Sequence, residues 1–435
     1  MSEKHKIVVV GGGAAGLELV SRLGRKLGKK GLAEITLIDA KRTHIWKPLL
    51  HEVAAGSLDV AEYQLEYLAQ AHWRHFKYRL GRMAGLDRER KLVHVAPTCN
   101  AQGEVIIPER EFAYDTLIIA VGSVSNDFQI KGVREQCLFL DTLSEAESFQ
   151  RRLLETLLHI HTNKQSDPGQ LGVAIIGAGA TGVELTAQLH QVTRQLNAYG
   201  LDELNPEQDI RLHLIEAGSR ILPQLPEAIA TEARQKLQDL GVHVHENERV
   251  VEVTEEGVYT QGGDFIQAGI TVWAAGIKAP DFLHDIDGLE TNNINQLVVS
   301  KDLQTTRDPN IFALGDCAAC PDDKLGFVPP RAQAAHQQAS FLASNIERTL
   351  KGKKPVREYQ YHDYGSLITL GRYSTVGSLM GQIPGSIMVS GFIARTVYLS
   401  LHKMHQIALF GWLRTALLTL AHLLRRGVDP EVKLH

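Results

Sequence analysis

Short apolar runs rich in β-branched residues alternate along the chain with segments of helical periodicity, and two of these runs lead directly into glycine-rich turns. The first run is Lys6–Val10 and the second is Leu171–Ile176. Each run predicts a buried strand, and the turn after it predicts the start of a helix. The repetition of strand, turn and helix predicts an α/β protein with two related lobes.

Both turns have glycines at the G-x-G-x-x-G spacing of a dinucleotide-binding site. These glycines are Gly11, Gly13 and Gly16 in the first turn and Gly177, Gly179 and Gly182 in the second. Glycine lets the backbone turn sharply and approach a pyrophosphate, and the helix beyond presents free N–H groups at its positive end. One such match is weak support, but two in one chain favour a protein that binds two dinucleotides.

An acidic residue ends the next strand after each glycine turn. It is Asp39 in the first lobe and Glu216 in the second. An acid in this position typically binds the ribose hydroxyls. Glu216 favours NADH, because a carboxylate would repel the 2′-phosphate of NADPH, although the nearby Arg220 leaves NADPH open. The glycines and the acid are farther apart in the second lobe, and the polar segment 191–209 predicts an insertion there.

Later segments return the chain to the two nucleotide sites. One apolar strand ends at Gly122 and another at Gly276, and each predicts the close of a lobe. The segment Leu297–Gly315 predicts strand, turn and strand, and Asp316 follows it. An acid at this point is placed to bind a ribitol hydroxyl of a flavin.

The segment Thr43–Asp59 is predicted to be a loop and contains Lys47. Two interpretations stay open for it. The segment packs against the rest of the protein without a further role, or Lys47 and the two residues after it form a wall of a flavin site.

At 435 residues the chain is too long for one ordinary core, so several domains are expected. The motifs predict a discontinuous FAD-binding domain, 1–125 with 295–365, around an NADH-binding domain, 126–294. A third region, 366–435, is predicted to hold a hairpin and amphipathic membrane-anchoring helices.

Composition narrows the function classes. The hydrophobic and charged contents, 44% and 22%, are those of a globular protein, and a net charge of -4 gives no reason to expect nucleic acid as a partner. The N-terminus has no signal-peptide pattern and the chain has four cysteines, which predicts a reducing, cytosolic environment. No run of about 18 apolar residues predicts a simple transmembrane helix.

Cys317 and Cys320 form a C-x-x-C pair. A structural zinc site would need a second pair, so no metal is expected. The two thiols are either incidental or have a redox role.

The last segment of the chain differs from the rest in charge. There is no Asp or Glu between Asp363 and Asp429, whereas basic residues recur, and from Phe392 the pattern is helical and amphipathic. One face of the predicted helix carries Leu413, Ala416, Leu417, Leu420 and Leu424. A basic helix of this kind favours the plane of an anionic membrane surface, and the alternative is a helical pair that covers the sheet or a dimer interface.

Three polar residues are candidates for the chemistry. Gln333 and Gln337 lie one helical turn apart, so their amides share a face that is either simply polar or able to bind a carbonyl group of a substrate. Glu184 follows the last glycine of the second turn by two residues. It is either a first-turn glutamate favoured by the helix dipole or a carboxylate close to the nicotinamide.

Together these features resemble the type II NADH:quinone oxidoreductases, and the bacterial respiratory members look most similar. The resemblance covers nearly the whole chain and is carried by the two glycine turns, the basic C-terminal helices and three short motifs. These motifs are W-A-A-G (Trp273–Gly276), G-D-C-A (Gly315–Ala318) and A-Q-A-A-H-Q (Ala332–Gln337).

The resemblance implies two Rossmann-like domains of the glutathione-reductase type and one non-covalently bound FAD. It also implies a peripheral membrane protein on the cytoplasmic side of the bacterial inner membrane, usually a homodimer, that passes electrons from NADH to a membrane quinone without pumping protons. By position, FAD is expected at Gly11, Gly13, Gly16, Asp39 and Asp316, and NADH at Gly177, Gly179, Gly182 and Glu216. Lys47, Gly122, Gly276 and Ala332 complete the expected cofactor-binding set, and Glu184, Gln333 and Gln337 are the expected catalytic residues.

Rival functions differ in what they require. A disulfide reductase of this fold needs a cysteine pair at about residues 40–60, where none occurs. A sulfide:quinone oxidoreductase-like flavoenzyme also needs reactive cysteines at the flavin. A non-enzymatic redox sensor that binds FAD and NADH stays open.

Overall fold

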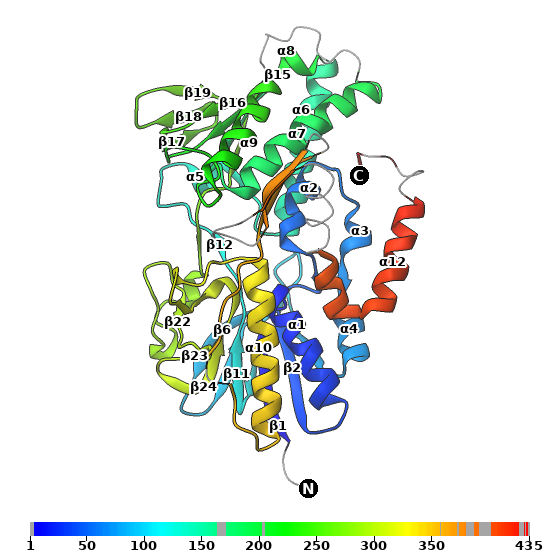
Figure 1. The fold of residues 1–435 in the computed structure, drawn as a ribbon, viewed down its shortest axis with the longest axis vertical. Coiled ribbons are helices and arrows are strands. Elements are labelled where there is room, and N and C mark those ends of the chain that lie inside the picture. Colours follow the sequence, from blue (N-terminus) through cyan, green and yellow to red (C-terminus); the bar gives the residue numbers. More distant parts are fainter. Residues whose placement is uncertain are drawn as a thin grey trace.

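The computed structural model describes residues 4–162, 171–201, 205–356, 358–371, 374–379, 387–390, 402–425, 430 and 432–433. Two α/β lobes follow one another along the long axis, and the C-terminal helices lie along one side (Figure 1).

The first lobe is built on a six-stranded sheet in the order β23-β24-β11-β1-β2-β5. These strands are β1 (His5–Val10), β2 (Ala33–Asp39), β5 (Lys77–Leu80), β11 (Thr116–Ile119), β23 (Gln304–Thr305) and β24 (Asp308–Ala313). The pairings are parallel except that between β23 and β24. Since β24 lies beside β11, the chain returns to this sheet after it has built the second lobe.

Two helices pack against each other in the first lobe, α1 (Ala14–Leu23) and α10 (Ala332–Leu350). The α1 helix continues as a π-helical turn, η1 (Gly24–Gly28). The lobe also has a smaller antiparallel sheet of β10 (Arg110–Ala113), β7 (Leu92–Val95) and β6 (Met83–Asp87) and a hairpin of β8 (Thr98–Cys99) and β9 (Val105–Ile107).

The second lobe is built on a parallel five-stranded sheet in the order β13-β20-β14-β15-β16. These strands are β13 (Cys137–Phe139), β14 (Leu171–Ile176), β15 (Ile210–Ile215), β16 (His243–His245) and β20 (Ile270–Trp273). Every residue of the central β14 is buried, as its continuous apolar run predicts. The short edge strand β13 is not evident from the sequence pattern.

Three helices accompany this sheet, α6 (Leu143–Thr162), α7 (Ala180–Ala198) and α9 (Glu227–Asp239). The α7 helix is longer than α1, so part of the predicted insertion extends this helix. A short helix, α8 (Pro206–Asp209), follows before β15, and three strands form a small antiparallel sheet, β17 (Val250–Thr254), β18 (Gly257–Thr260) and β19 (Phe265–Gln267).

The two lobes are linked by a pair of antiparallel strands, β12 (Val124–Ser125) and β21 (Ile277–Lys278). One leads out of the first lobe and the other leads back toward it. The predicted α/β fold with two related Rossmann-like lobes and helices at the C-terminal end is confirmed.

The predicted loop Thr43–Asp59 is wrong in part, because it contains a 3-10 turn, η2 (Lys47–Leu49), and a helix, α2 (Leu50–Ala54). Leu50, Val53 and Ala54 are buried in the core of the second lobe. Contact with α6 and α7 therefore stabilises a helix that is too short for its sequence periodicity to be evident.

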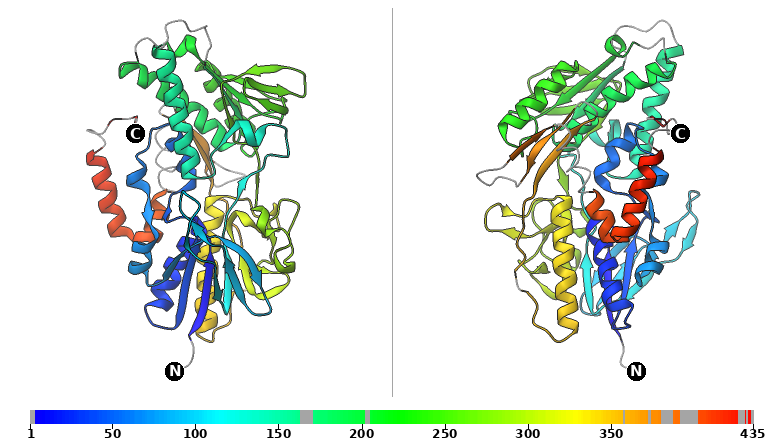
Figure 2. Two further views of the ribbon diagram at one scale, coloured as in Figure 1. Left: turned by 180° about the vertical axis from the view of Figure 1, so that it is seen from behind. Right: turned by 45° about the vertical axis from the view of Figure 1, so that its right-hand side comes forward.

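The C-terminal region begins with an antiparallel meander of β28 (Gly365–Leu370), β29 (Ser374–Leu379) and β30 (Ile387–Ser390). Residues 402–410 are helical, and α12 (Trp412–Arg425) follows after Gly411. Both helices lie against the segment of α3 (Val60–Tyr63) and α4 (Tyr67–Arg74) in the first lobe (Figure 2). The start of the predicted amphipathic segment, Phe392 to Leu401, lies outside the described residues.

Candidate functional site

The first glycine turn has the geometry of a close-packed strand–helix junction. Gly11 has a φ of +99°, which L side chains rarely adopt. A Cβ on Gly16 would lie 1.9 Å from the carbonyl oxygen of Gly11, so α1 packs directly against the turn. A Cβ on Gly13 would meet nothing within 4 Å. The turn therefore has free space at the N-terminus of α1, where a pyrophosphate would lie.

The second glycine turn repeats this geometry almost unchanged. Gly177 has a φ of +103°, and a Cβ on Gly182 would lie 2.0 Å from the carbonyl oxygen of Gly177. A Cβ on Gly179 would again meet nothing within 4 Å. The two turns thus share both the close helix–strand contact and the free space in front of the helix.

The two predicted ribose acids are held in the same way. The carboxylate of Asp39 accepts hydrogen bonds from the backbone N–H of Gly12, at 2.6 Å, and of Lys41, at 2.7 Å. Burial raises the pKa of Asp39. The carboxylate of Glu216 accepts from the N–H of Ala178, at 2.9 Å, and of Gly218, at 2.8 Å. Each acid is therefore fixed at the mouth of its glycine turn, and the residues of both lobes fit a dinucleotide.

Lys47 and Asp316 belong to one polar network between the lobes, and Gly122 lies next to it in the chain. The Lys47 ammonium donates to the backbone carbonyl of Ser123, at 3.0 Å, and to the carboxylate of Asp141, also at 3.0 Å. The hydroxyl of Ser123 in turn donates to the carboxylate of Asp316, at 2.8 Å. Gly122, which precedes Ser123, has a φ of +72°.

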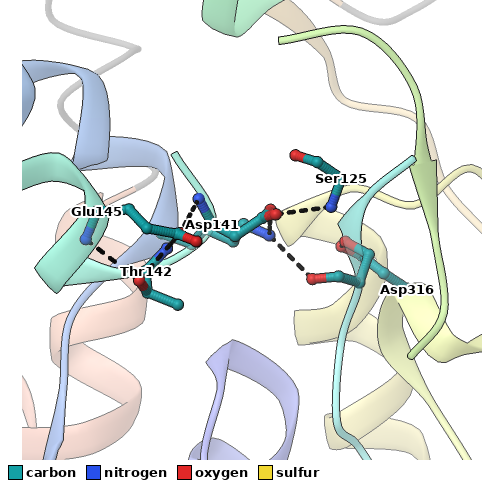
Figure 3. Close-up of polar contacts among 7 residues, drawn as sticks. Ser125, Asp141, Thr142, Glu145 and Asp316 are labelled. Atoms are coloured by element: carbon teal, nitrogen blue, oxygen red, sulfur yellow. Dashed lines mark hydrogen bonds and ion pairs between the residues drawn. The ribbon is translucent and has the colours of Figure 1, made fainter. Parts of the chain in front are cut away.

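Sequence reasoning missed Ser123 and Asp141. Asp141 also accepts from the N–H of Ser125, at 2.6 Å, so it joins the first lobe to the start of α6 (Figure 3). The sequence contained a local signal for this site. Thr142 and Glu145 form the capping box of α6, in which the Glu145 carboxylate accepts from the N–H of both Asp141 and Thr142.

Glu184 lies inside the protein, at the meeting point of α7, α2 and β28. Its carboxyl accepts a hydrogen bond from the N–H of Thr369, at 3.0 Å, and lies 3.8 Å from Nδ1 of His51. Only 7% of Glu184 is exposed. It is the fifth residue of α7, and the first turn of α7 has no acidic residue, so the interpretation as a first-turn glutamate is wrong.

Burial has opposite effects on the two titratable groups here. It raises the pKa of Glu184 to about 8, with a further increase from Glu52 and a decrease from the Thr369 hydrogen bond. It lowers the pKa of His51 to about 4. A protonated carboxyl and a neutral imidazole thus face each other at neutral pH, and this pair is able to store a proton without a buried charge.

Gln333 and Gln337 share a face of α10, as predicted, and both amides bind the segment 362–365. The Gln333 amide donates to the carbonyl of Gly365, at 3.1 Å, and accepts from the N–H of Tyr364, at 3.1 Å. The Gln337 amide donates to the carbonyl of His362, at 2.8 Å, and accepts from its N–H, at 3.0 Å. The pair therefore fixes the chain where it enters β28.

Gln338 is a further residue that the sequence analysis missed. Its amide oxygen accepts from the N–H of Gly315, at 2.7 Å. The residue before Asp316 is thereby tied to α10, whose first residue is Ala332. On the side of the second lobe, Gly276 has a φ of +65°, and a Cβ there would lie 2.4 Å from the ring of Phe128.

Cys317 and Cys320 are buried and are not joined in a disulfide. Burial raises the pKa of Cys317 to about 11 and that of Cys320 to about 12. Both thiols are protonated at neutral pH and are therefore weak nucleophiles. Within the described part of the chain, no three His, Cys, Asp or Glu side chains are arranged to hold a metal ion.

A cavity of about 430 Å³ lies between the C-terminal helices and the first lobe. Its apolar walls include Trp46, Leu65, Trp73, Leu409, Phe410 and Leu417, and its polar lining includes His44, Glu62, His402, His405 and Arg414. The Arg414 guanidinium lies 5.5 Å from the centre of the Trp73 ring. The cavity therefore extends from the C-terminal helices to His44, whose ring lies next to Gly12 of the first glycine turn.

The outer face of α12 is apolar and exposed. Between 55% and 73% of each of Trp412, Leu413, Leu420, Leu423 and Leu424 is accessible, whereas the exposed Leu417 and Leu418 also line the cavity. The predicted amphipathic face is confirmed over this helix. None of the helices in the described ranges is both long and apolar enough to cross a membrane.

Comparison with known proteins agrees with this geometry. Residues 5–339 match the sequence profile of the pyridine nucleotide-disulphide oxidoreductase family. The chain is 41% identical to the type II NADH:quinone oxidoreductase of Haemophilus influenzae, over 99% of both chains. It is 29% identical to the protein of that name from Staphylococcus aureus, over 87% of this chain and 91% of that one.

Among solved structures, the fold is similar to that of NDH2 from Plasmodium falciparum in complex with NADH. The TM-score is 0.81 at 19% identity, and the similarity covers 99% of this chain and 100% of the other.

Proposed function

The chain belongs to the pyridine nucleotide-disulphide oxidoreductases and, within them, to the type II NADH:quinone oxidoreductases, and from this premise we propose how it works. It transfers a hydride from NADH to a non-covalently bound FAD and then passes the electrons to a membrane quinone, without pumping protons. The observation that carries this proposal is the repeated glycine turn, in which each lobe holds one carboxylate at its mouth.

FAD belongs to the first lobe in this proposal. The free space at Gly13 would receive the pyrophosphate, and Asp39 would bind the ribose. Asp316 and Lys47, joined through Ser123, lie where the ribitol and the ring would follow. Bound FAD supplies the hydride acceptor, while the chain supplies position and excludes water.

NADH belongs to the second lobe. Gly179 leaves room for the pyrophosphate, and Glu216 would bind the ribose hydroxyls and disfavour a 2′-phosphate. From there the nicotinamide would extend toward the polar network between the lobes. Glu184 lies on the helix that begins at this turn, which supports its assignment close to the nicotinamide.

The overall reaction takes up one proton, because NADH gives a hydride whereas a quinone needs two protons and two electrons. Glu184 is protonated at neutral pH and is a candidate for holding this proton at the site. The proposal places the quinone near the N-terminal end of α10, where Gln333 and Gln337 fix the segment 362–365.

The C-terminal helices would bind the membrane. Leucines on the outer face of α12 would enter the headgroup boundary of an anionic bilayer, with basic residues beside them. We place the protein on the cytoplasmic side of the bacterial inner membrane, as a homodimer, on the basis of the resemblance to the family.

An anaerobic spectroscopic experiment tests the main proposal. NADH should bleach the absorbance of the bound flavin, and a soluble quinone analogue should restore it. Bleaching without restoration by the quinone would contradict the proposal and would favour a redox sensor that binds FAD and NADH. Restoration only by sulfur compounds would favour a sulfide:quinone oxidoreductase.

A further inference from the structure

A chain of hydrogen bonds runs from the C-terminal helix 402–410 to the first glycine turn. His405 lies on this helix, and its Nε2 is 3.1 Å from Nε2 of His44. The other ring nitrogen of His44, Nδ1, is 3.0 Å from the carbonyl oxygen of Gly12. Both histidines are buried, and both line the cavity between the C-terminal helices and the first lobe.

The geometry fixes which nitrogen donates in the neutral pair. A carbonyl oxygen only accepts, so Nδ1 of His44 carries its hydrogen and donates it to Gly12. Nε2 of a neutral His44 is then an acceptor, and Nε2 of His405 must donate to it. The chain therefore has one direction, from His405 through His44 to Gly12.

Gly12 is the middle of the proposed FAD turn. Its N–H donates to the carboxylate of Asp39, and its carbonyl oxygen also accepts from the hydroxyl of Tyr67, at 2.7 Å. The peptide groups on both sides of this residue are thus fixed, one by the ribose acid and the other by His44 with Tyr67. Displacement of His44 would release one of the two donors to this carbonyl.

The helix 402–410 packs on the first lobe through Leu409, which is buried in the core, and through ring contacts of His402 with Trp46 and Tyr63. The amide of Gln70 donates to the carbonyl of Leu409, at 3.2 Å, and Arg74 donates to the same carbonyl. The rings of Trp46 and His405 lie 4.2 Å apart. The histidine pair is the contact that leads from this helix to the glycine turn.

We propose that His44 and His405 are positioning residues through which the C-terminal helical segment holds the FAD turn in its binding geometry. This inference rests on the proposed FAD site. Docking of the C-terminal helical segment therefore affects FAD binding, although His405 does not contact the turn itself.

The charges around the pair make this contact depend on pH. His44 and His405 face each other, and His402 and His336 also face His405, while Lys403 and His422 lie near His402. Glu62 and Arg414 line the same cavity, and Asp39 lies beyond Gly12. Burial lowers the pKa of His44 to about 4, and burial with the neighbouring histidines lowers the pKa of His405.

The sign follows from these directions. When the helix 402–410 leaves the first lobe, the imidazoles of His44 and His405 take up protons below their ordinary pKa of 6.5. When the helix is docked, burial opposes their protonation. The docked form is therefore fully stable above pH 6.5 and loses stability as pH falls toward 4. Each titrating histidine shifts the equilibrium by up to about tenfold per pH unit.

The test compares variants of the full-length, FAD-loaded protein. His405→Leu removes the donor, whereas His405→Gln keeps an N–H donor but takes up no proton. His422→Leu is the matched control, since its ring lies on α12, 3.7 Å from Glu62, outside the hydrogen-bond chain. The readouts are the FAD dissociation constant and hydrogen exchange of peptides that cover residues 11–17 and 402–410, corrected for intrinsic rates.

At pH 7.5 we expect H405L to weaken FAD binding about tenfold, because a buried acceptor on His44 is left without its donor. H405Q and H422L should bind FAD as the wild type does. Between pH 6.5 and 5.5, the protection of residues 402–410 from hydrogen exchange should fall less steeply in H405Q than in the wild type. The difference in slope corresponds to the uptake of up to about one proton.

A second pair of variants keeps the test decisive if H405L folds poorly. His44→Asn keeps a donor near the position of Nδ1 but has no atom to meet His405. We expect H405L to add little to the loss caused by H44N, because both interrupt the same chain. Additive losses, wild-type FAD binding and exchange in H405L, or equal losses in H405Q and H405L would overturn the inference.

Failure of the proposed function gives a different result. A protein that does not bind FAD would refute the FAD site, while exchange at residues 11–17 would still report the contact with His405. If FAD binds and is bleached by NADH, but hydrogen exchange of residues 11–17 is the same in the His405 variants as in the wild type, only the proposed coupling is refuted.

Discussion

Glu184 lies in an environment very different from that of a surface glutamate, since its carboxyl group is buried beside His51. Its pKa is raised to about 8 in the folded protein from an ordinary value of 4.5. Between these two pH values the folded protein keeps a proton that the unfolded chain has already released. Stability from this group is therefore fully present below pH 4.5 and is lost as pH rises toward 8. The same shift that makes Glu184 a candidate proton holder thus costs the fold stability.

Glu184→Gln should remove this pH dependence. The amide keeps an acceptor for Thr369 N–H and is neutral at every pH. The free energy of unfolding of E184Q, relative to that of the wild type, should increase by about 2–3 kcal/mol between pH 5.5 and 7.5. Thermal unfolding of the flavin-loaded protein at several pH values measures it.

Glu347→Gln is the matched control for this experiment. Hydrogen bonds with Lys26 and Lys351 lower the pKa of Glu347 to about 2. Its contribution is fully present above pH 4.5, so the effect of E347Q should be constant from pH 5.5 to 7.5. If the difference in stability from the wild type depends on pH in the same way for E184Q and E347Q, Glu184 is ionised in the folded protein.

Glu216 should decide between the two nicotinamide cofactors. Glu216→Ser removes the carboxylate that would bind the ribose hydroxyls and repel a 2′-phosphate. We expect KM for NADH to rise about tenfold and KM for NADPH to fall, with kcat for NADH little changed, since the interaction is the same in ground and transition states. Steady-state kinetics with both cofactors measures this.

Glu246→Gln is a suitable control for E216S, because Glu246 lies close to Glu216 and also accepts a backbone N–H, from Ile221, whereas the N–H of Ala178 in the glycine turn donates to Glu216. An unchanged preference for NADH in E216S would mean that this carboxylate does not set the choice of cofactor.

At the scale of elements, the two glycine turns allow a matched pair of substitutions. Gly16→Ala and Gly182→Ala place a methyl group 1.9 Å and 2.0 Å from a backbone oxygen, so each helix must move away from its strand. We expect G16A to lose its flavin on purification. G182A should keep the flavin but need far more NADH to bleach it.

Gly179→Ala separates loss of binding from loss of packing in the second turn. Its Cβ would meet no atom of the protein, so the thermal unfolding temperature should stay within about 1 °C of the wild type's, whereas NADH binding should weaken because the methyl group occupies the pyrophosphate space. Loss of flavin from G182A, or equal effects of G16A and G182A on both ligands, would contradict the assignment of one nucleotide to each lobe.

The same elements show what the sequence can and cannot predict. The glycine turns, their strands and the positions of Asp39 and Glu216 at the turns were predictable because the spacing of residues within one βαβ unit determines their geometry. Asp141 and His51 were not, because their role depends on segments that meet only in the fold. The α2 helix was missed for the same reason, since its stability comes from contact with α6 and α7.

On the scale of the whole molecule, the C-terminal region connects three parts that the sequence suggested separately. The segment 362–365 is fixed by Gln333 and Gln337, β28 brings Thr369 to Glu184, and the helix 402–410 reaches the first glycine turn through His405 and His44. The region therefore contacts both lobes at their proposed sites. Its removal as a block would disturb the cofactor sites, so membrane binding needs a more selective test.

Substitutions on the outer face of α12 provide that test. Leu413, Leu420 and Leu424 are 57%, 55% and 72% exposed and do not line the cavity, so their replacement by Gln leaves 402–410 in place. Burying three leucines in the headgroup boundary contributes several kcal/mol, so the partition of the triple variant onto anionic vesicles should fall about a hundredfold or more. Cosedimentation with vesicles measures this partition.

The matched control for these changes replaces three comparably exposed leucines elsewhere, Leu32, Leu158 and Leu325, with Gln. The control should bind vesicles as the wild type does. In the α12 variant, NADH should still bleach the flavin and a soluble quinone analogue should still restore it, while the reduction of a quinone embedded in vesicles should fall with the bound fraction. Unchanged sedimentation of the α12 variant would mean that this face does not carry membrane binding, and an increase in the monomer fraction of the variant would show that the face contacts a second copy of the chain.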